Sequence, residues 1–129
     1  MGVMEGTQSL KEASGEYEFA VDGGAVSTIV LRGGPAGGEI PAGSVILGGY
    51  VEVDTSVLSG TGTVAVQAEA AADILAATGA AGLTAGRKSI IPAFTGAASV
   101  KTTVRRNITI VIATAALTAG KFRVVLFYR

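Results

Sequence analysis

The 129-residue sequence contains no histidine, no cysteine and no tryptophan. Without histidine, no side chain titrates near neutral pH in its ordinary environment. Without cysteine, the chain has no thiolate nucleophile, no disulfide and no sulfur ligand for a metal. Because these are the side chains on which most catalytic sites depend, the sequence indicates a protein that is not an enzyme and uses no cofactor.

Pairs of carboxylates are the remaining candidates for catalysis. Glu16 and Glu18 form one pair and Glu52 and Asp54 another, and each pair lies on one face of an extended segment. Glycosidases hold their two carboxylates on facing elements across a cleft. Both pairs are therefore interpreted as the solvated face of a strand.

Metal, nucleic-acid and membrane binding also find little support in the sequence. Glu69 and Asp73 lack the further oxygen ligands of a calcium loop, so no metal site is expected. The net charge is zero and only three tyrosines are present, which disfavours nucleic-acid binding. The most hydrophobic uncharged stretch, residues 107–120, is shorter than the roughly 20 residues of a membrane-spanning helix, so no membrane association is expected.

Charge is scarce as well as balanced. Charged residues make up 16% of the chain and hydrophobic residues 49%, against roughly 25% charged residues in an average soluble protein. This composition predicts apolar surface that is buried between copies, in a homotrimer. The alternative is that alanine inflates the hydrophobic count while burying little area.

The charges are also segregated along the chain. Residues 1–73 contain two basic and ten acidic residues, a net charge of −8, whereas residues 74–129 contain eight basic residues and no acidic ones, a net charge of +8. In a Greek-key or jelly-roll sandwich, early strands pair with late ones and these charges would cancel. Alternatively, the two halves present patches of opposite sign to partner surfaces.

Period-two alternation, interrupted by glycines, runs from Glu16 to Tyr128 and predicts an all-β fold. We expect a single jelly-roll-like antiparallel β-sandwich of about eight strands over residues 16–129, after a flexible N-terminal arm over residues 1–15. The expected strands are residues 16–22, 25–31, 44–55, 63–68, 87–91, 99–104, 107–114 and 121–128; residues 70–77 are expected to form a short strand, or else one helical turn.

Several local features are specific enough to test. Asp22-Gly23-Gly24 predicts a hairpin between the first two strands. Gly48-Gly49 predicts a bulge or bend in a strand in which Val45, Leu47, Val51 and Val53 share one face.

Two further features concern turns and the last strand. Leu-Thr-Ala-Gly occurs at residues 83–86 and 117–120 and predicts the same turn twice, with leucine in the core and glycine at positive φ. Residues 121–128 are apolar on both faces, which predicts a central strand or one packed at an interface.

The densest basic region supplies the candidate binding residues. Arg105 and Arg106 are adjacent, and Lys101, Arg87 and Lys88 precede them, with no acidic residue after Asp73. One interpretation is solvated turn charge. The other is a patch that docks on an acidic protein surface, since the arginine fork pairs well with carboxylates.

A family resemblance extends over residues 17–128. The segments that carry it are Phe19-Ala-Val-Asp-Gly-Gly-Ala-Val, Ile40-Pro-Ala-Gly-Ser-Val-Ile, Gly49-Tyr-Val-Glu-Val-Asp-Thr, Val64-Ala-Val-Gln-Ala-Glu, Ala72-Asp-Ile-Leu-Ala-Ala and Ala116-Leu-Thr-Ala-Gly-Lys-Phe. In this order they resemble small virion proteins of tailed bacteriophages. These motifs are strand and turn signals rather than a reactive signature.

The resemblance implies a capsid decoration (cement) protein, synthesised in the host cytoplasm, that binds the major capsid protein as a trimer on the outside of the head. It implies no catalytic residue. The alternative within the same group is a host-surface or carbohydrate-binding module of a head fibre or tail, which the absence of tryptophan disfavours because sugar rings stack on Trp or Tyr.

Overall fold

The structure is a computed structural model that describes residues 10–33, 37–88 and 100–129. Within these ranges it contains twelve strands, a one-turn helix and a 3₁₀ turn. They are β1 (Lys11–Glu18), α2 (Phe19–Asp22), β2 (Ser27–Val30), β3 (Arg32–Gly33), β4 (Glu39–Ile40), β5 (Val45–Leu58), β6 (Thr63–Gln67), β7 (Leu75–Gly79), η1 (Ala80–Gly82), β8 (Gly86–Lys88), β9 (Val100–Lys101), β10 (Arg106–Asn107), β11 (Thr109–Ala113) and β12 (Ala119–Tyr128). In this part of the chain, neither helix is long and apolar enough to cross a bilayer.

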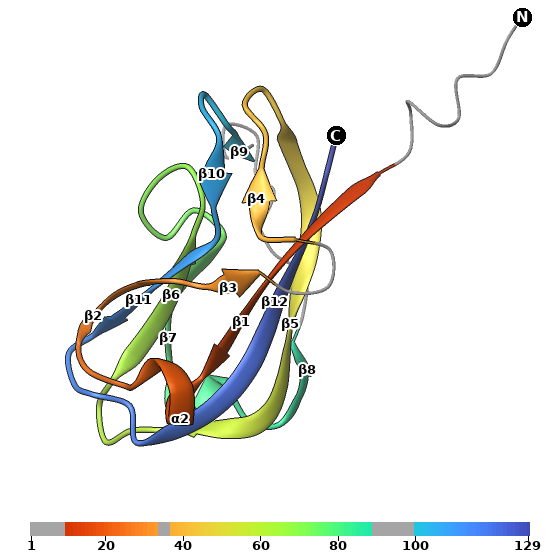
Figure 1. Ribbon diagram of the computed structural model, residues 1–129. Helices are drawn as coiled ribbons and strands as arrows, with labels where there is room; N and C mark the ends of the chain where they lie inside the picture. The colour runs from red at the N-terminus through yellow and green to blue at the C-terminus, as the bar shows by residue number, and fades with distance from the viewer. Residues whose placement is uncertain (1–9, 34–36, 89–99) are drawn as a thin grey trace, which may run out of the picture.

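Two antiparallel sheets face each other, on the left and right of Figure 1. The larger has the order β3-β1-β12-β5-β8, with β9 also beside β5, and the smaller has the order β2-β11-β6-β7. The four pairs β1·β12, β2·β11, β5·β8 and β6·β7 form one long antiparallel ribbon that rolls onto itself, which is jelly-roll topology. The predicted all-β sandwich is confirmed.

The core lies between the two sheets because alternate residues of each strand point inward. Ile110 and Ile112 of β11 face Val124 and Leu126 of β12, and all four are at most 1% exposed. Strand β12 lies between β1 and β5, so the prediction that the last strand is central is confirmed. Its second face is the outer surface of the larger sheet, where Val125 is also buried.

The first strand begins earlier than the sequence suggested. Residues 11–15, predicted as part of a flexible arm, form the first half of β1 and pair with β12. Their alternation is hidden because the inward residues are small: Ala13 is buried, and a Cβ on Gly15 would lie only 2.6 Å from the Cβ of Leu31. Residues 1–9 of the predicted arm lie outside the described residues.

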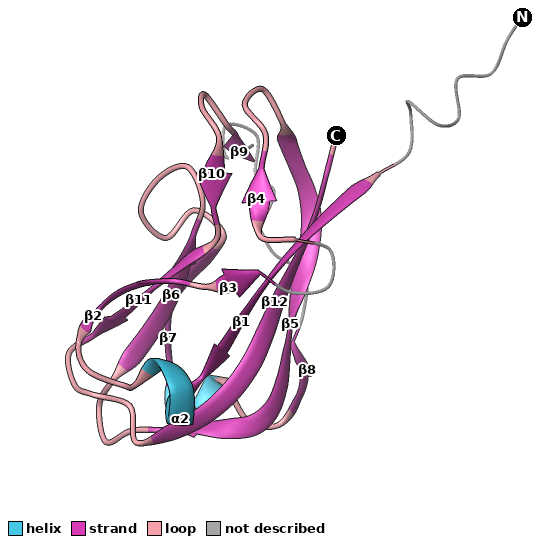
Figure 2. Ribbon diagram, viewed as in Figure 1, coloured by secondary structure: helices cyan, strands magenta, loops and turns pink. Residues whose placement is uncertain are grey.

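The predicted first hairpin is wrong. Residues 19–22 turn into the short helix α2 (Figure 2), and β2 then joins the opposite sheet beside β11. Asp22 stabilises this change of direction after β1, since its carboxylate accepts the backbone N–H of Glu18 at 2.8 Å and an N–H of Arg32 at 3.1 Å. Burial, and then the Asp22 charge, raise the pKa of Tyr17, whose hydroxyl donates to the Gly23 carbonyl at 2.6 Å.

Strand β5 contains the predicted irregularity near Gly48-Gly49. Its register with β12 shifts between the pairs Phe127↔Gly48 and Tyr128↔Ile46. The shift places Ile46 in the core and leaves Leu47 41% exposed. The prediction that Val45 and Leu47 share one face with Val51 and Val53 is therefore wrong, because the bulge changes which residues face inward.

The two Leu-Thr-Ala-Gly segments form matching turns, as predicted. Leu83 and Leu117 are each 2% exposed, and Gly86 and Gly120 have φ of 126° and 144°. Both turns bind the end of β5: the Leu83 carbonyl accepts the N–H of Val57, and Thr118 donates its N–H to the Leu58 carbonyl.

Candidate functional site

The five predicted binding residues lie in two separate places. Arg87 and Lys88 belong to β8 and Lys101 to β9, and both strands pair with the same edge of β5. Arg106 is the first residue of β10, which pairs with β4 at the upper end of the sandwich in Figure 1, and Arg105 directly precedes it. The structure therefore does not gather these residues into one patch.

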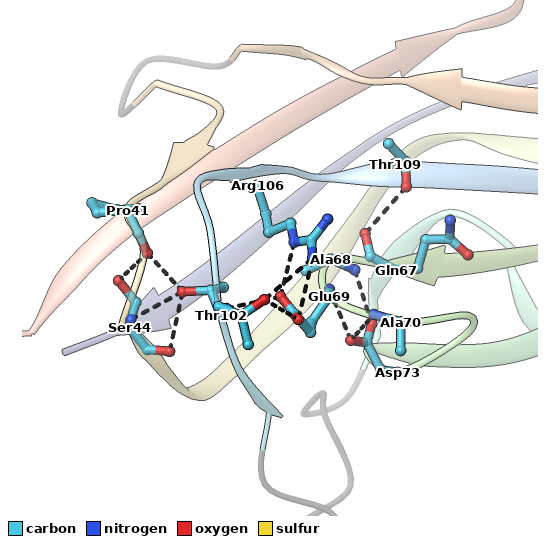
Figure 3. Close-up of polar contacts among 11 residues, drawn as sticks. Pro41, Ser44, Gln67, Ala68, Glu69, Ala70, Asp73, Thr102, Arg106 and Thr109 are labelled. Atoms are coloured by element: carbon cyan, nitrogen blue, oxygen red, sulfur yellow. Dashed lines mark hydrogen bonds and ion pairs between the residues drawn. The ribbon is translucent and has the colours of Figure 1, made fainter.

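Arg106 is already paired within the chain. Its Nε donates to Glu69 Oε1 at 2.8 Å and its Nη2 to Glu69 Oε2 at 3.2 Å (Figure 3). Thr103 adds its backbone N–H and its hydroxyl to the same carboxylate. The Arg106 hydrogen bonds, followed by those from Thr103, lower the pKa of Glu69 to about 2.

Arg105 differs from its neighbour. Its side chain is 72% exposed and its nearest carboxylate oxygen, on Glu39, is 3.8 Å away. Such a pair is weak and screened by salt. The interpretation of both arginines as free turn charge is thus wrong for Arg106, because Glu69 is 37 residues away in sequence but adjacent in space.

Two further polar contacts hold this end of the sandwich. Thr102 is 1% exposed, and its hydroxyl donates to the Pro41 carbonyl at 2.7 Å and accepts the backbone N–H of Ser44 at 3.0 Å (Figure 3). Asp73 accepts the N–H groups of Ala68, Glu69 and Ala70. These bonds close residues 70–74 into a turn, so only the end of the strand predicted over residues 70–77 belongs to β7.

The outer face of the larger sheet carries a ladder of charges with alternating sign. The register places Arg32, Glu16, Arg123, Glu52 and Arg87 side by side across five strands. The distance between Arg123 and Glu16 is 3.6 Å and that between Arg87 and Glu52 is 3.9 Å.

The ladder belongs to a wider pattern of charge pairing. Of the five ion pairs among the described residues, four join a basic residue after position 74 to an acidic residue before it. The predicted cancellation of the two charged halves is confirmed for these pairs.

An open hollow lies beside this ladder. It has a volume of about 610 Å³ and is lined by Leu47, Gly48, Gly49, Tyr50, Arg87, Lys88 and Phe127. The Arg87 guanidinium lies 4.3 Å from the Tyr50 ring centre, and the rings of Tyr50 and Phe127 are 6.2 Å apart. The hollow thus combines an apolar floor with the exposed Arg87 guanidinium. Lys88 also lines it, but the register sets Lys88 opposite the inward-facing Val51, and its ammonium donates to the Thr84 hydroxyl at 3.0 Å.

Sequence reasoning missed the apolar part of the hollow. Tyr50 and Phe127 are on outward positions of β5 and β12, which period two alone would have indicated. The exposure of Leu47 could not be read in this way because it depends on the bulge in β5.

The described residues include no group of three or more acidic, histidine or cysteine side chains that could hold a metal ion. No protein-family model matches the sequence. No curated protein matches it either.

Two solved structures share the fold. One is a chain of the acidic stable capsid structure of Helicobacter pylori bacteriophage KHP30, with a TM-score of 0.63, 13% identity, and coverage of 94% of this chain and 87% of that one. The other is a chain of the cyanophage Pam1 capsid asymmetric unit, with a TM-score of 0.62, 17% identity, and coverage of 99% and 98%. At these identities the similarity shows the fold, and it extends over nearly the whole of each chain.

Proposed function

We propose that this protein is a structural virion protein of a tailed bacteriophage, a decoration (cement) protein that binds the outside of the head as a homotrimer and stabilises it. The observation that carries the proposal is the near full-length fold match to chains of two phage capsid structures. Because this chain covers 98% of the Pam1 chain, that chain is of about the same length. The lack of histidine and cysteine agrees with a role in binding rather than catalysis.

The mechanism is binding to the major capsid protein. Any ligand that binds the assembled state alone stabilises that state. Three linked copies multiply modest contacts, since after the first copy binds, the others bind at high effective concentration. The protein then acts as a clamp across neighbouring capsid subunits.

The docking surface that we propose is the hollow with its basic edge. The Arg87 side chain lies over the Tyr50 ring and 3.9 Å from Glu52, yet it is 62% exposed, so its remaining N–H donors can reach a partner carboxylate. Lys88 lines the same hollow and Lys101 continues the edge along β5. An acidic loop of the capsid with one apolar side chain would fit this chemistry. Arg105 is a further exposed cation, away from the hollow, whereas Arg106 stabilises the fold through its pair with Glu69.

Co-sedimentation with heads prepared without this protein tests the proposal. The purified chain should pellet with such heads and raise the temperature at which they rupture. Arg87→Glu should weaken binding at least tenfold and reduce its salt dependence, because it replaces the cation over the Tyr50 ring with a negative charge. Lys121→Glu is the matched control, as Lys121 is exposed on the same face but outside the hollow. Failure of the chain to bind any head would refute the proposal, and equal loss in both variants would refute the docking surface.

The second candidate is a host-surface or carbohydrate-binding module, which the two aromatic rings of the hollow favour. The position of Arg87 over the Tyr50 ring weighs against it, since that ring face is covered rather than open to a sugar. Specific binding to host glycans by a chain that ignores heads would establish this second function instead.

A further inference from the structure

A second hollow lies where the smaller sheet meets β10, at the upper end of the sandwich in Figure 1. It has a volume of about 330 Å³, and its lining includes Val30, Gln67, Glu69, Arg105, Arg106 and Asn107. Three of these side chains, Gln67, Glu69 and Arg106, are drawn in Figure 3. We call this site the polar hollow. It shares no lining residue with the hollow beside β5.

The polar hollow contains one cation that has no close counter-charge. Arg106 and Glu69 cancel each other, since both carboxylate oxygens of Glu69 accept N–H groups of Arg106, and Thr103 donates two further hydrogen bonds to them. The nearest carboxylate oxygen to Arg105 belongs to Glu39, at 3.8 Å. Both side chains of that pair are well exposed, so water screens it. Arg105 therefore remains available to a carboxylate from outside the chain.

Two side-chain amides of the polar hollow are also available for binding. Within the described part of the chain, the amides of Gln67 and Asn107 have no hydrogen-bond partner, and each offers two N–H donors and one acceptor oxygen. The lining contains no aromatic ring on which a sugar could stack. A guanidinium beside two amides suits a carboxylate side chain and the peptide groups next to it.

The turn that carries Arg105 is held on both sides. Before it, Thr102 is buried in the hydrogen-bond network of this end of the sandwich, and Thr103 bonds Glu69. After it, Arg106 bonds the same carboxylate. Because the backbone on both sides is already fixed, little ordering entropy is lost when Arg105 binds a partner. The two adjacent arginines thus have different roles: Arg106 positions the turn, and Arg105 is presented by it.

We propose that the polar hollow binds an aspartate or glutamate side chain of a partner protein, with Arg105 as the anchoring cation. The partner's carboxylate takes the place of Glu39 beside the Arg105 guanidinium, and the amides of Gln67 and Asn107 bind the neighbouring peptide groups. The identity of the partner, an acidic segment of the phage head, rests on the proposed function. The polar hollow is then a second contact with the head, on the opposite sheet from the hollow beside β5.

A capped tripeptide with a central glutamate tests the site without heads, and the same peptide with a central glutamine is the matched probe. NMR of the isotope-labelled chain can follow the side-chain amides, since the sequence contains two glutamines and one asparagine. At neutral pH and millimolar concentration, the glutamate peptide should cause saturable shifts in the amide signals of Gln67 and Asn107, and Arg105→Gln should abolish them. Equal shifts with both peptides, or no saturable shift, would overturn the proposal.

Head binding gives a second readout, in which one variant should gain affinity. Glu39→Gln removes the carboxylate that competes for Arg105, so it should tighten binding about threefold, whereas Arg105→Glu should weaken it roughly tenfold or more. Glu12→Gln is the control for Glu39→Gln, because it makes the same change in net charge at an exposed position outside the polar hollow.

The outcomes separate this site from the decoration role. Equal effects of Glu39→Gln and Glu12→Gln would show that only net charge matters and would overturn the proposed site. Heads bound equally well by Arg105→Glu and by the unmodified chain would also overturn it, and would leave the decoration role intact. A chain that binds the glutamate peptide but no heads refutes the decoration role alone.

Discussion

Thr102→Val should destabilise the protein far more than its conservative shape suggests. Valine keeps the volume of threonine but removes the hydroxyl that accepts the Ser44 N–H and donates to the Pro41 carbonyl. An unsatisfied buried N–H costs about 1–3 kcal/mol, and loss of a neutral hydrogen bond costs about 0.5–1.5 kcal/mol. The Pro41 carbonyl keeps a bond from the Ser44 hydroxyl at 2.7 Å, so only the smaller cost applies there. The expected loss is about 2–4 kcal/mol.

Thermal and urea unfolding at one fixed protein concentration measure this loss. With an unfolding entropy of about 2.1 cal/mol/K per residue, the midpoint should fall by about 7–15 °C. Thr118→Val is the control, since its hydroxyl is exposed and donates to the Leu58 carbonyl at 3.2 Å; it should change stability by less than about 0.5 kcal/mol. If Thr102→Val costs no more than Thr118→Val, the network does not hold this end of the sandwich.

Two other substitutions test the site by different physics. The pKa of Glu69 is lowered from about 4.5 to about 2. Its pairing therefore stabilises the fold fully above pH 4.5, and this stabilisation is lost as pH falls through 2. The difference in free energy of unfolding between wild type and Glu69→Gln should shrink over that pH window, and a constant difference would contradict the pairing. Gly49→Ala should lower the free energy of unfolding by about 1–3 kcal/mol, because its Cβ would overlap the Val125 carbonyl oxygen. Gly48→Ala, the neighbouring control, places its Cβ in open space and should leave stability unchanged or raise it. Equal unfolding midpoints for the two variants would show that the bulge is misplaced.

The strongly alternating strands could be predicted from the sequence. Residues 121–128 and 107–114 carry bulky apolar residues every second position, and they cover most of β12 and all of β11. The repeated Leu-Thr-Ala-Gly turn was equally readable, since a buried leucine and a glycine at positive φ are local requirements. Features that depend on one short segment could therefore be predicted from the sequence.

Features that depend on partners distant in the sequence could not be predicted in this way. The start of β1 was missed because Ala13 and Gly15 give no hydrophobic signal, although the close approach of Leu31 requires a glycine there. The hairpin was wrongly predicted because Asp22 followed by two glycines is typical of a hairpin turn and equally of the end of a short helix such as α2. Arg106 was taken for a free charge because its partner Glu69 lies on the loop after β6, which only the fold brings near.

The segregation of charge along the chain explains why the two faces of the sandwich differ. A rolled antiparallel ribbon pairs early strands with late ones, so an acidic first half and a basic second half meet as neighbours on the larger sheet. Those charges neutralise one another across the ladder, and β8 and β9 place Arg87, Lys88 and Lys101 along the free edge of β5. Among the described residues, the strands of the smaller sheet place no charged side chain on its outer face. The edge of the larger sheet is therefore suited to an acidic partner, and Arg87→Glu should weaken head binding whereas Lys121→Glu should not.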